Sequence, residues 1–310
     1  MEVSPRFFVL DTVMIDVVLK ISSLPLRGSD ALVTNRLVTA GGGFNAMSAA
    51  ARQGMAVTYV GQVGGGPFAD IALDALREQE IEVAVQPRGD QDLGICIVLV
   101  EGDGERTFVT SPGAEGTLSA SDLLSVAIGD GDYVFFSGYN FVYPQIRGEM
   151  MTWLRQLSSR VVVAFDPGPR VLDIPAEVLR EVMARTDWFL CNAGEASSLT
   201  GDECASASAE RLLATTGRRG VVVRDGVRGC VLARADQAIV EVPGVPTQVV
   251  DTNGAGDVHN GVLLAELARG TTYVEALRRA NVGAAIAISA FGPATCPSRE
   301  VVSEKLARSS

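Results

Sequence analysis

The seven residues Asp251-Thr-Asn-Gly-Ala-Gly-Asp257 organise the rest of this chain. They follow a largely β-branched run at 247–250 and precede an apolar helical pattern from Val258 to Ala268. This order predicts a strand, a glycine-rich turn and a helix. The N-terminus of a helix presents unpaired backbone N–H groups at the positive end of the helix dipole. The segment therefore predicts a binding site for an anion such as phosphate.

Asp257 is unusual at such a site, because a carboxylate repels the anion that the N–H groups attract. The combination makes sense if Asp257 takes a proton from a hydroxyl group while the N–H groups of Gly254, Ala255 and Gly256 stabilise the charge on a phosphoryl group in transfer. Aspartate is also a common capping residue at the start of a helix. The motif alone leaves a catalytic and a structural interpretation open.

The composition excludes several functional classes. The chain has 310 residues and a net charge of −11, and no Lys/Arg cluster could neutralise a nucleic-acid backbone. No segment reaches the roughly 18 apolar residues of a membrane span, and the N-terminus lacks the pattern of a secretory signal. The five cysteines form no CxxC pair. We therefore expect reduced thiols in the core, and a cytoplasmic protein without nucleic-acid or membrane partners.

A second glycine motif, Ala40-Gly-Gly-Gly-Phe-Asn45, precedes a helical pattern at 46–53 that ends at Gly54. Glycines before a helix allow a ligand to approach the backbone closely. The spacing also imitates a dinucleotide-binding fingerprint. However, no Asp or Glu occurs between Asn45 and Phe68, where an acid that binds the ribose would be expected. The sequence therefore argues against a dinucleotide-dependent oxidoreductase.

From about residue 120 onwards, strand and helix patterns alternate regularly. The predicted strands are 133–136, 161–165, 188–191, 221–224 and 230–233, and the predicted helices are 121–128, 144–157, 176–184, 194–200 and 207–215. This alternation predicts an α/β fold with a doubly wound, mostly parallel sheet flanked by helices. Ligands of such folds bind at the carboxyl ends of strands. The polar residues that fall there are Ser137, Asp166, Asn192, Arg224 and Asp257.

The N-terminal third has a different pattern. A strand pattern begins at Phe7 to Leu10 and continues, after Asp11-Thr12, from Val13 to Ile21, where it contains Asp16. Further strand patterns lie at 32–39, 93–101 and 106–110. The last two predict a hairpin around Gly102-Asp-Gly104. Together these strands predict a small separate sheet that acts as a lid. Asp16 lies either on a solvated strand face or in a pocket, and the pattern does not choose between them.

With both glycine motifs in place, the chain resembles the PfkB (ribokinase-like) family of carbohydrate and nucleoside kinases over essentially its whole length. The further segments that carry the resemblance are Asn192-Ala-Gly-Glu195, Arg224-Asp-Gly226-x-x-Gly229, Asn281, and 287–292. Ser137-Gly-Tyr139 and Asp166-Pro-Gly-Pro-Arg170 are similar to a bacterial subgroup known only as sugar kinases. The resemblance implies one ribokinase-like domain over 1–310, with a lid formed by about 12–39 and 93–110 and an α/β core formed by the remainder.

The resemblance also implies a role for each matching residue. Asp257 would be the base that deprotonates the acceptor hydroxyl, and the N–H groups of Gly254, Ala255 and Gly256 would hold the γ-phosphoryl charge. The acceptor would be bound by Asp16, Gly41, Gly42, Asn45 and Tyr139; the nucleotide by Asn192, Arg224, Gly226, Gly229 and Asn281; and the metal by Glu195, Asn192 and Asp251. ATP and Mg²⁺ are the implied cofactors, and many members also use a monovalent cation such as K⁺ near 287–292.

Three departures from the family pattern concern the acceptor. Asp11 stands where the family commonly has glycine, Gly42 replaces the lysine found in ribokinases, and Gly64-Gly-Gly66 lacks the common Asp-Asp pair. His259 replaces a common aromatic residue two positions after Asp257, and we expect it to pack within the helix or to touch a ligand. These changes leave the phosphoryl-transfer end intact and leave the identity of the acceptor open.

The function implied is ATP-dependent phosphorylation of a primary hydroxyl of a small sugar. A nucleoside kinase that acts on the ribose hydroxyl and a sugar-binding sensor without turnover remain as alternatives. An aromatic wall from Phe44, Phe141 or Tyr139 facing the acceptor would favour a nucleoside, because a base stacks on aromatic rings. Asp257 and Glu195 argue against a sensor, since binding alone needs neither. The exposed edges of a lid sheet predict pairing with a second copy, as a homodimer.

Overall fold

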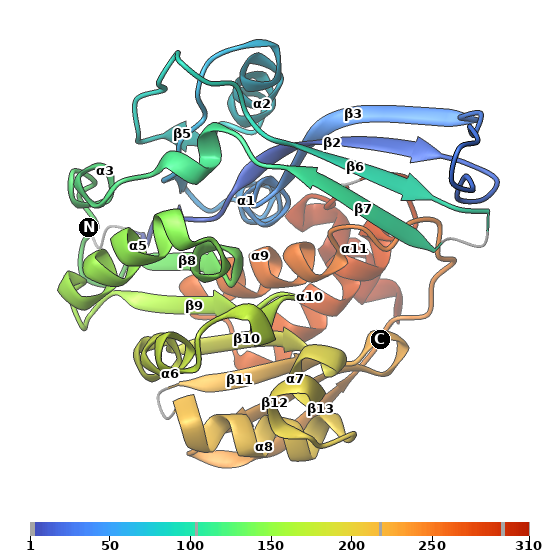
Figure 1. Ribbon diagram of the computed structural model, residues 1–310. Coiled ribbons are helices and arrows are strands. Elements are labelled where there is room, and N and C mark those ends of the chain that lie inside the picture. The colour runs from blue at the N-terminus through green and yellow to red at the C-terminus, as the bar shows by residue number, and fades with distance from the viewer. Residues whose placement is uncertain (1–3, 103–104, 217–218, 293–294, 310) are drawn as a thin grey trace.

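The computed structural model describes residues 4–102, 105–216, 219–292 and 295–309 (Figure 1). Two sheets organise these residues. One is a nine-stranded sheet with helices on both faces, and the other is a four-stranded sheet at the upper right of the view. Within the described ranges, no helix is both long enough and apolar enough to cross a membrane.

The large sheet is parallel except at one edge. Its strand order is β13-β12-β11-β10-β9-β8-β1-β4-β5. The strands are β1 (Phe7–Val9), β4 (Val57–Tyr59), β5 (Glu82–Val83), β8 (Tyr133–Ser137), β9 (Val162–Asp166), β10 (Trp188–Asn192), β11 (Gly220–Arg224), β12 (Gly229–Arg234) and β13 (Gln237–Pro243). β12 pairs antiparallel with both of its neighbours, β11 and β13. The predicted doubly wound, mostly parallel sheet is confirmed.

Helices cover both faces of this sheet, which explains why its strands are apolar on both sides. The helices are α1 (Phe44–Arg52), α2 (Pro67–Glu78), α3 (Ala120–Leu124), α4 (Tyr139–Val142), α5 (Pro144–Gln156), α6 (Ala176–Arg185), α7 (Ala193–Thr200), α8 (Ala205–Thr216), α9 (Ala255–Ala268), α10 (Tyr273–Ala287) and α11 (Arg299–Ser309). Phe7 packs in the apolar layer that α1, α2, α9 and α10 share, and Phe8 packs in the layer of α3 to α8. Side chains that alternate along a strand thus build two separate cores.

The small sheet consists of β2 (Val13–Lys20), β3 (Asn35–Gly42), β6 (Ile95–Val100) and β7 (Arg106–Ser111), in the order β3-β2-β6-β7. The strand pattern from Phe7 to Ile21 divides at Asp11-Thr12 between two sheets, because the chain leaves the large sheet after β1 and enters the small one at β2. After β3 the chain leaves the small sheet again and enters α1. This second crossing lies next to the first, since the N–H of Gly43 donates to the carbonyl of Thr12 at 2.8 Å. Of the predicted turn at Gly102-Asp-Gly104, residues 103 and 104 lie outside the described residues.

The predicted strand at 247–250 is wrong. This segment has no strand partner, because the large sheet ends at β13. The N–H groups of Val250 and Asp251 instead donate to the carbonyl of Ile288 at the end of α10. The glycine-rich turn is therefore held by a helix terminus rather than by a sheet. One cysteine also departs from expectation: Cys191, Cys230 and Cys296 are buried, but Cys204 is exposed.

The crossing of α1 and α9 brings the two glycine motifs together. Gly261 of α9 lies against α1, where a Cβ atom would stand 2.7 Å from the Cβ of Ala49 and would also collide with the carbonyl of Ala46. Only a residue without a side chain allows this approach. The contact places the start of α1 beside the start of α9, although about 200 residues separate the motifs in sequence.

Replacing Gly261 with Ala tests this contact. In a helix, a Gly-to-Ala change ordinarily stabilises by about 1 kcal/mol. Here the clash with α1 should outweigh that gain, and we expect a net loss of about 1–3 kcal/mol in the free energy of unfolding. Chemical denaturation would measure it. Gly148 of α5 is the matched control, because a Cβ atom at that position would meet no heavy atom within 4 Å. Gly148→Ala should stabilise, and equal effects of the two changes would contradict the packing.

Candidate active site

The N-terminus of α9 is open to an anion. Gly254 precedes the helix with φ of 72°, a left-handed conformation that side chains disfavour. The N–H of Ala255 donates to the carbonyl of Thr252 at 3.3 Å. The N–H groups of Gly254 and Gly256 find no acceptor among the described residues. The turn therefore presents unpaired donors at the positive end of a 14-residue helix.

Asp257 lies in the first turn of α9 and is half-buried. Burial, together with the negative charges of Asp166 and Asp11, raises its pKa from 3.8 to about 8. Asn45 opposes the shift, since its Nδ2 donates to Oδ2 of Asp257 at 3.3 Å. The carboxyl group is thus poised near neutral pH, as a general base requires.

Arg224 joins several polar residues behind Asp257. It donates to Oδ1 of Asn260 at 2.6 Å and to Oδ2 of Asp166 at 3.0 Å. Asn260 donates to the same Asp166 oxygen at 2.7 Å. The Glu195 carboxylate lies 3.9 Å from Arg224. One buried guanidinium therefore faces two acidic side chains, and the net charge of this group is negative.

Asn192 and Glu195 form a reciprocal cap at the start of α7. The N–H of Asn192 donates to Glu195, the N–H of Glu195 donates to Asn192, and both distances are 2.8 Å. This local role alone would explain the pair in the sequence. Burial and the charge of Asp166 nevertheless raise the pKa of Glu195 to about 7, partly offset by Arg224. The carboxylate sits in surroundings where a further cation would be favoured.

A cavity of about 620 Å³ adjoins the N-terminus of α9. Its size falls within the usual range for small-molecule sites. All five residues predicted to bind a nucleotide line it: Asn192, Arg224, Gly226, Gly229 and Asn281. The remaining wall is largely apolar and includes Val227, Val245, Val249, Ala284 and Ile288. The apolar wall could contact a flat apolar group of a ligand, and the N-terminus of α9 at Gly256 could bind an anionic group of the same ligand.

His259 packs within the fold, which is one of the two alternatives expected for it; contact with a ligand stays a prediction. It is buried in α9, where its Nε2 lies 3.2 Å from Oδ1 of Asn281. It also lines the cavity. Burial, together with the charge of Arg224, lowers its pKa to about 3, so the ring is neutral at physiological pH. His259 therefore acts as a hydrogen-bonding group of the cavity wall rather than as a proton donor.

The residues predicted to bind the acceptor come from other elements than α9, and two of them contact α9 or the turn before it: Asn45 contacts Asp257, and Asp16 hydrogen-bonds Asn253. Asp16 is buried in β2 rather than placed on a solvated face, and Gly41 and Gly42 lie on the paired strand β3. Asn45 opens α1 and contacts Asp257. Tyr139 is half-buried at the start of α4, and its ring stacks on that of Tyr143 at 6.3 Å. These residues come from β2, β3, α1 and α4.

Three contacts of the site were not predicted from the sequence. Arg106 of β7 forms an ion pair with buried Asp251, whose other oxygen accepts from the N–H of Gly292 at 3.0 Å. The side chain of Asn253 hydrogen-bonds Asp16 and offsets part of the effect of burial, which raises the pKa of Asp16 to about 6. Asn260 could have been found from its spacing, because it follows Asp257 by three residues on the same helix face. No comparable spacing in the sequence indicates the contacts of Arg106 and Asn253.

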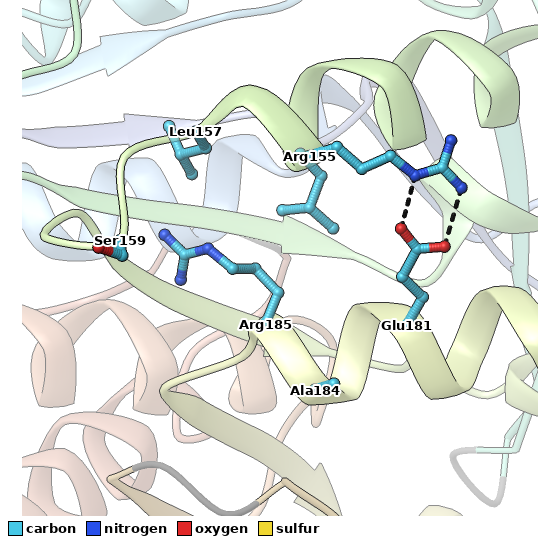
Figure 2. Close-up of a pocket in the computed structure, with 7 residues that line it drawn as sticks. Arg155, Leu157, Ser159, Glu181, Ala184 and Arg185 are labelled. Carbon is cyan, nitrogen blue, oxygen red and sulfur yellow. Dashed lines mark hydrogen bonds and ion pairs between the residues drawn. The ribbon is translucent and has the colours of Figure 1, made fainter.

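A second cavity, of about 300 Å³, lies between α5 and α6 and contains none of these residues (Figure 2). Figure 2 shows Arg155 of α5 directed at Glu181 of α6, with hydrogen bonds of 2.6 and 2.8 Å. Exposed pairs of this kind contribute little to stability. We assign no function to this cavity.

The profile of the pfkB family carbohydrate kinases matches residues 5–300 of the chain. An uncharacterised sugar kinase of Escherichia coli (strain K12), YegV, is 32% identical over 301 residues, which are 94% of this chain and 91% of that protein. A ribokinase structure from Thermotoga maritima superposes with a TM-score of 0.83 at 23% identity, over 98% of this chain and 99% of that one. The structure of adenosine kinase from Sinorhizobium meliloti gives 0.83 at 20% identity, over 99% and 100%. The two structural similarities support the fold and do not distinguish a sugar from a nucleoside.

Replacing Asp257 with Asn tests the electrostatics of the site through stability. The pKa of this group is about 8 in the folded chain against an ordinary 3.8, so between these values the folded state binds more protons than the unfolded state. This group should therefore lower the free energy of unfolding as pH rises from about 4 to about 8. We expect Asp257→Asn to raise the melting temperature, and by more at pH 8 than at pH 5.

Asp132 offers a control of opposite sign. Although burial alone would raise its pKa, the hydrogen bonds from Arg6 outweigh that effect and lower it. Asp132→Asn should therefore lower the melting temperature at pH 8. A lower melting temperature of Asp257→Asn at pH 8 would contradict the raised pKa.

Proposed function

Because the chain belongs to the pfkB family of carbohydrate kinases, we propose that it transfers the γ-phosphoryl group of ATP to a primary hydroxyl of a small sugar. The observation that carries this proposal is the position of Asp257. This residue lies in the first turn of α9, where the N–H groups of Gly254 and Gly256 find no acceptor among the described residues, and it accepts a hydrogen bond from Asn45 of the other glycine motif. The cavity of about 620 Å³ adjoins the same helix N-terminus.

In this proposal each group acts on a defined part of the reaction. Asp257 accepts the proton of the attacking hydroxyl, and Asn45 holds its carboxylate in place. The N–H groups of Gly254, Ala255 and Gly256 stabilise the negative charge of the phosphoryl oxygens in the transition state. The apolar wall of the cavity binds the base of ATP, and Arg224, Gly226, Gly229, Asn192 and Asn281 position the nucleotide. Positioning and electrostatic stabilisation are what phosphoryl transfer chiefly needs.

The residues around Glu195 fit Mg²⁺. Glu195 and Asp166 offer hard oxygen donors in surroundings that raise the pKa of Glu195, which shows negative charge that a cation would neutralise. No group of three His, Cys, Asp or Glu side chains in the described ranges could hold a metal alone. That is the usual situation for Mg²⁺, which takes one or two carboxylates, water and substrate phosphates. Glu195, next to Asn192, would hold the ion, which when bound supplies positive charge to the phosphates.

Asp251 is better suited to positioning than to binding a metal. Its carboxylate already accepts from Arg106 and from the N–H groups of Asn253 and Gly292. These contacts tie the turn before α9 to the small sheet. We therefore assign to Asp251 the support of the anion-binding turn.

The use of ATP and the five free cysteines support a cytoplasmic location.

The aromatic residues favour a sugar over a nucleoside. Phe44, the first residue of α1, packs in the core, and Phe141 packs edge-on against Phe136 and Phe165. Neither ring can stack on a base in the acceptor site. Tyr139 is half-buried and remains as one aromatic side chain at that site. A nucleoside kinase is the second candidate, supported by the shared fold with adenosine kinase.

A homodimer through the small sheet accompanies this proposal. The outer strands β3 and β7 are unpaired along one edge each in the described ranges. They carry Val38, Phe108 and Val109, which are 44–56% exposed. Exposed strand edges with apolar side chains favour pairing with another chain.

The kinase activity is tested by ADP release from Mg-ATP across a panel of pentoses, hexoses, sugar acids and nucleosides. We expect turnover with one class of neutral sugar, and a loss of about 10²- to 10⁴-fold in kcat for Asp257→Asn. The variant should keep its affinity for ATP in a binding assay. Turnover confined to nucleosides would favour the second candidate. Ligand-induced thermal shifts without any turnover that depends on Asp257 would identify a sensor instead.

The dimer is tested by sedimentation at micromolar concentration. We expect a dimer, and a shift toward monomer for Phe108→Ser, because the substitution removes an exposed apolar side chain from the proposed interface. Ile239→Ser is the matched control, since Ile239 is exposed on β13, the edge strand of the large sheet. A wild-type chain that sediments as a monomer throughout would rule out the dimer.

A further inference from the structure

Two buried carboxylates flank the glycine run between β3 and α1. Gly41 lies against Asp16, since a Cβ atom there would stand 2.7 Å from Oδ1 of Asp16. Gly43 lies against Asp11, since a Cβ atom there would stand 2.7 Å from the Cβ of Asp11. The absence of side chains at both glycines lets the two acids approach the backbone at the start of α1. Asp11 is close enough to Asp257 for its charge to raise the pKa of that residue.

The polar atoms of this region that have no hydrogen-bond partner among the described residues are acceptors. Oδ1 of Asp11 accepts from the N–H of Thr12 at 2.7 Å and from the hydroxyl of Ser137 at 2.6 Å. Its Oδ2 receives no hydrogen bond from the described residues. Asn45 is 2% exposed, and its Oδ1 is buried without a partner while its Nδ2 donates to Asp257. A buried acceptor without a donor is unfavourable, so these atoms call for a ligand that donates.

Asp11 and Asp16 have no compensating cation among the described residues, and the charge of Arg224 only partly lowers the pKa of Asp257. Asp11, Asp16 and Asp257 form no ion pair with any Lys or Arg of the described ranges. Arg224 is engaged by Asp166 and Asn260, and Arg106 by Asp251. Gly42 stands where ribokinases have a lysine. Burial raises the pKa of Asp11 and of Asp16 to about 6, as expected for acids that lack a cation.

We propose that Asp11 binds the acceptor directly, beside Asp16, and that the two acids restrict the enzyme to neutral polyhydroxylated sugars. This inference rests on the proposed kinase function. Hydroxyl groups donate to both carboxylates and to Oδ1 of Asn45. A sugar acid or a sugar phosphate brings further negative charge and acceptor atoms to the same place, and is excluded by repulsion and by the lack of donors. Asp11 is thus a specificity-determining residue that the family pattern does not supply.

The test compares the wild type with Asp11→Asn on neutral sugars, the aldonic acids derived from them, and sugar phosphates. Asparagine keeps the shape and an oxygen for Ser137 and Thr12 but removes the charge. We expect the KM for the neutral sugar to rise about 10- to 100-fold, the size expected for the loss of a charge-assisted hydrogen bond. The KM for ATP should stay unchanged, and kcat should change much less. The ratio of kcat/KM for the acid to that for the neutral sugar should rise about tenfold or more.

Two further variants keep the result interpretable. Ser137→Ala leaves Asp11 charged but removes the hydroxyl that orients it, so the KM for the sugar should rise without any gain in turnover of the acid. Asp132→Asn removes a buried carboxylate at the opposite end of β8 and controls for stability. If Asp11→Asn does not fold, Ser137→Ala and the acceptor profile of the wild type carry the test.

The outcomes separate the two proposals. Turnover of a sugar acid by the wild type as fast as of the neutral sugar would overturn the inference, and so would an unchanged KM in Asp11→Asn. The kinase function would survive both results. If no acceptor is turned over in a manner that depends on Asp257, the proposed function fails, and the inference fails with it.

Discussion

The close contact of α1 with α9 is the constraint on which the site depends. Gly261 has no side chain, and the two helices approach so closely that a methyl group would collide with Ala49. This approach places Asn45 within hydrogen-bonding distance of Asp257. The anion-binding turn and the acceptor-side glycines thereby share one space, although they belong to distant parts of the chain. Catalytic geometry here is a consequence of helix packing.

The site concentrates negative charge in a partly buried region. Its acids are Asp11, Asp16, Asp166, Glu195 and Asp257. Arg224 pairs with Asp166, lies 3.9 Å from Glu195 and partly lowers the pKa of Asp257. Such an arrangement destabilises the folded chain, because burial favours the neutral form of each acid. The same arrangement prepares the site for ligands that bring donors or positive charge. Stability is given up where function requires it, as is common at active sites.

Much of the core could be predicted from the sequence, because its elements repeat a local pattern. Strands from β8 to β11 are apolar runs between helical patterns, and the structure places them side by side as expected. The segment at 247–250 could not be predicted in this way. Its composition suits a strand, but a strand forms only where a neighbouring strand is available, and the sheet ends before it. The change of sheet after Phe7–Val9, by contrast, falls where the polar pair Asp11-Thr12 interrupts the strand pattern.

The candidate site divides along a similar line. Motifs that act within a few residues were visible in the sequence: the turn before α9, the cap formed by Asn192 and Glu195, and the glycines before α1. Their chemistry depends on backbone conformation and on neighbours along the chain, which a short pattern encodes. The ion pair of Arg106 with Asp251 and the hydrogen bond of Ser137 to Asp11 join residues more than 100 positions apart. Such contacts depend on how the sheets and helices pack in three dimensions, and only the folded chain brings those side chains together.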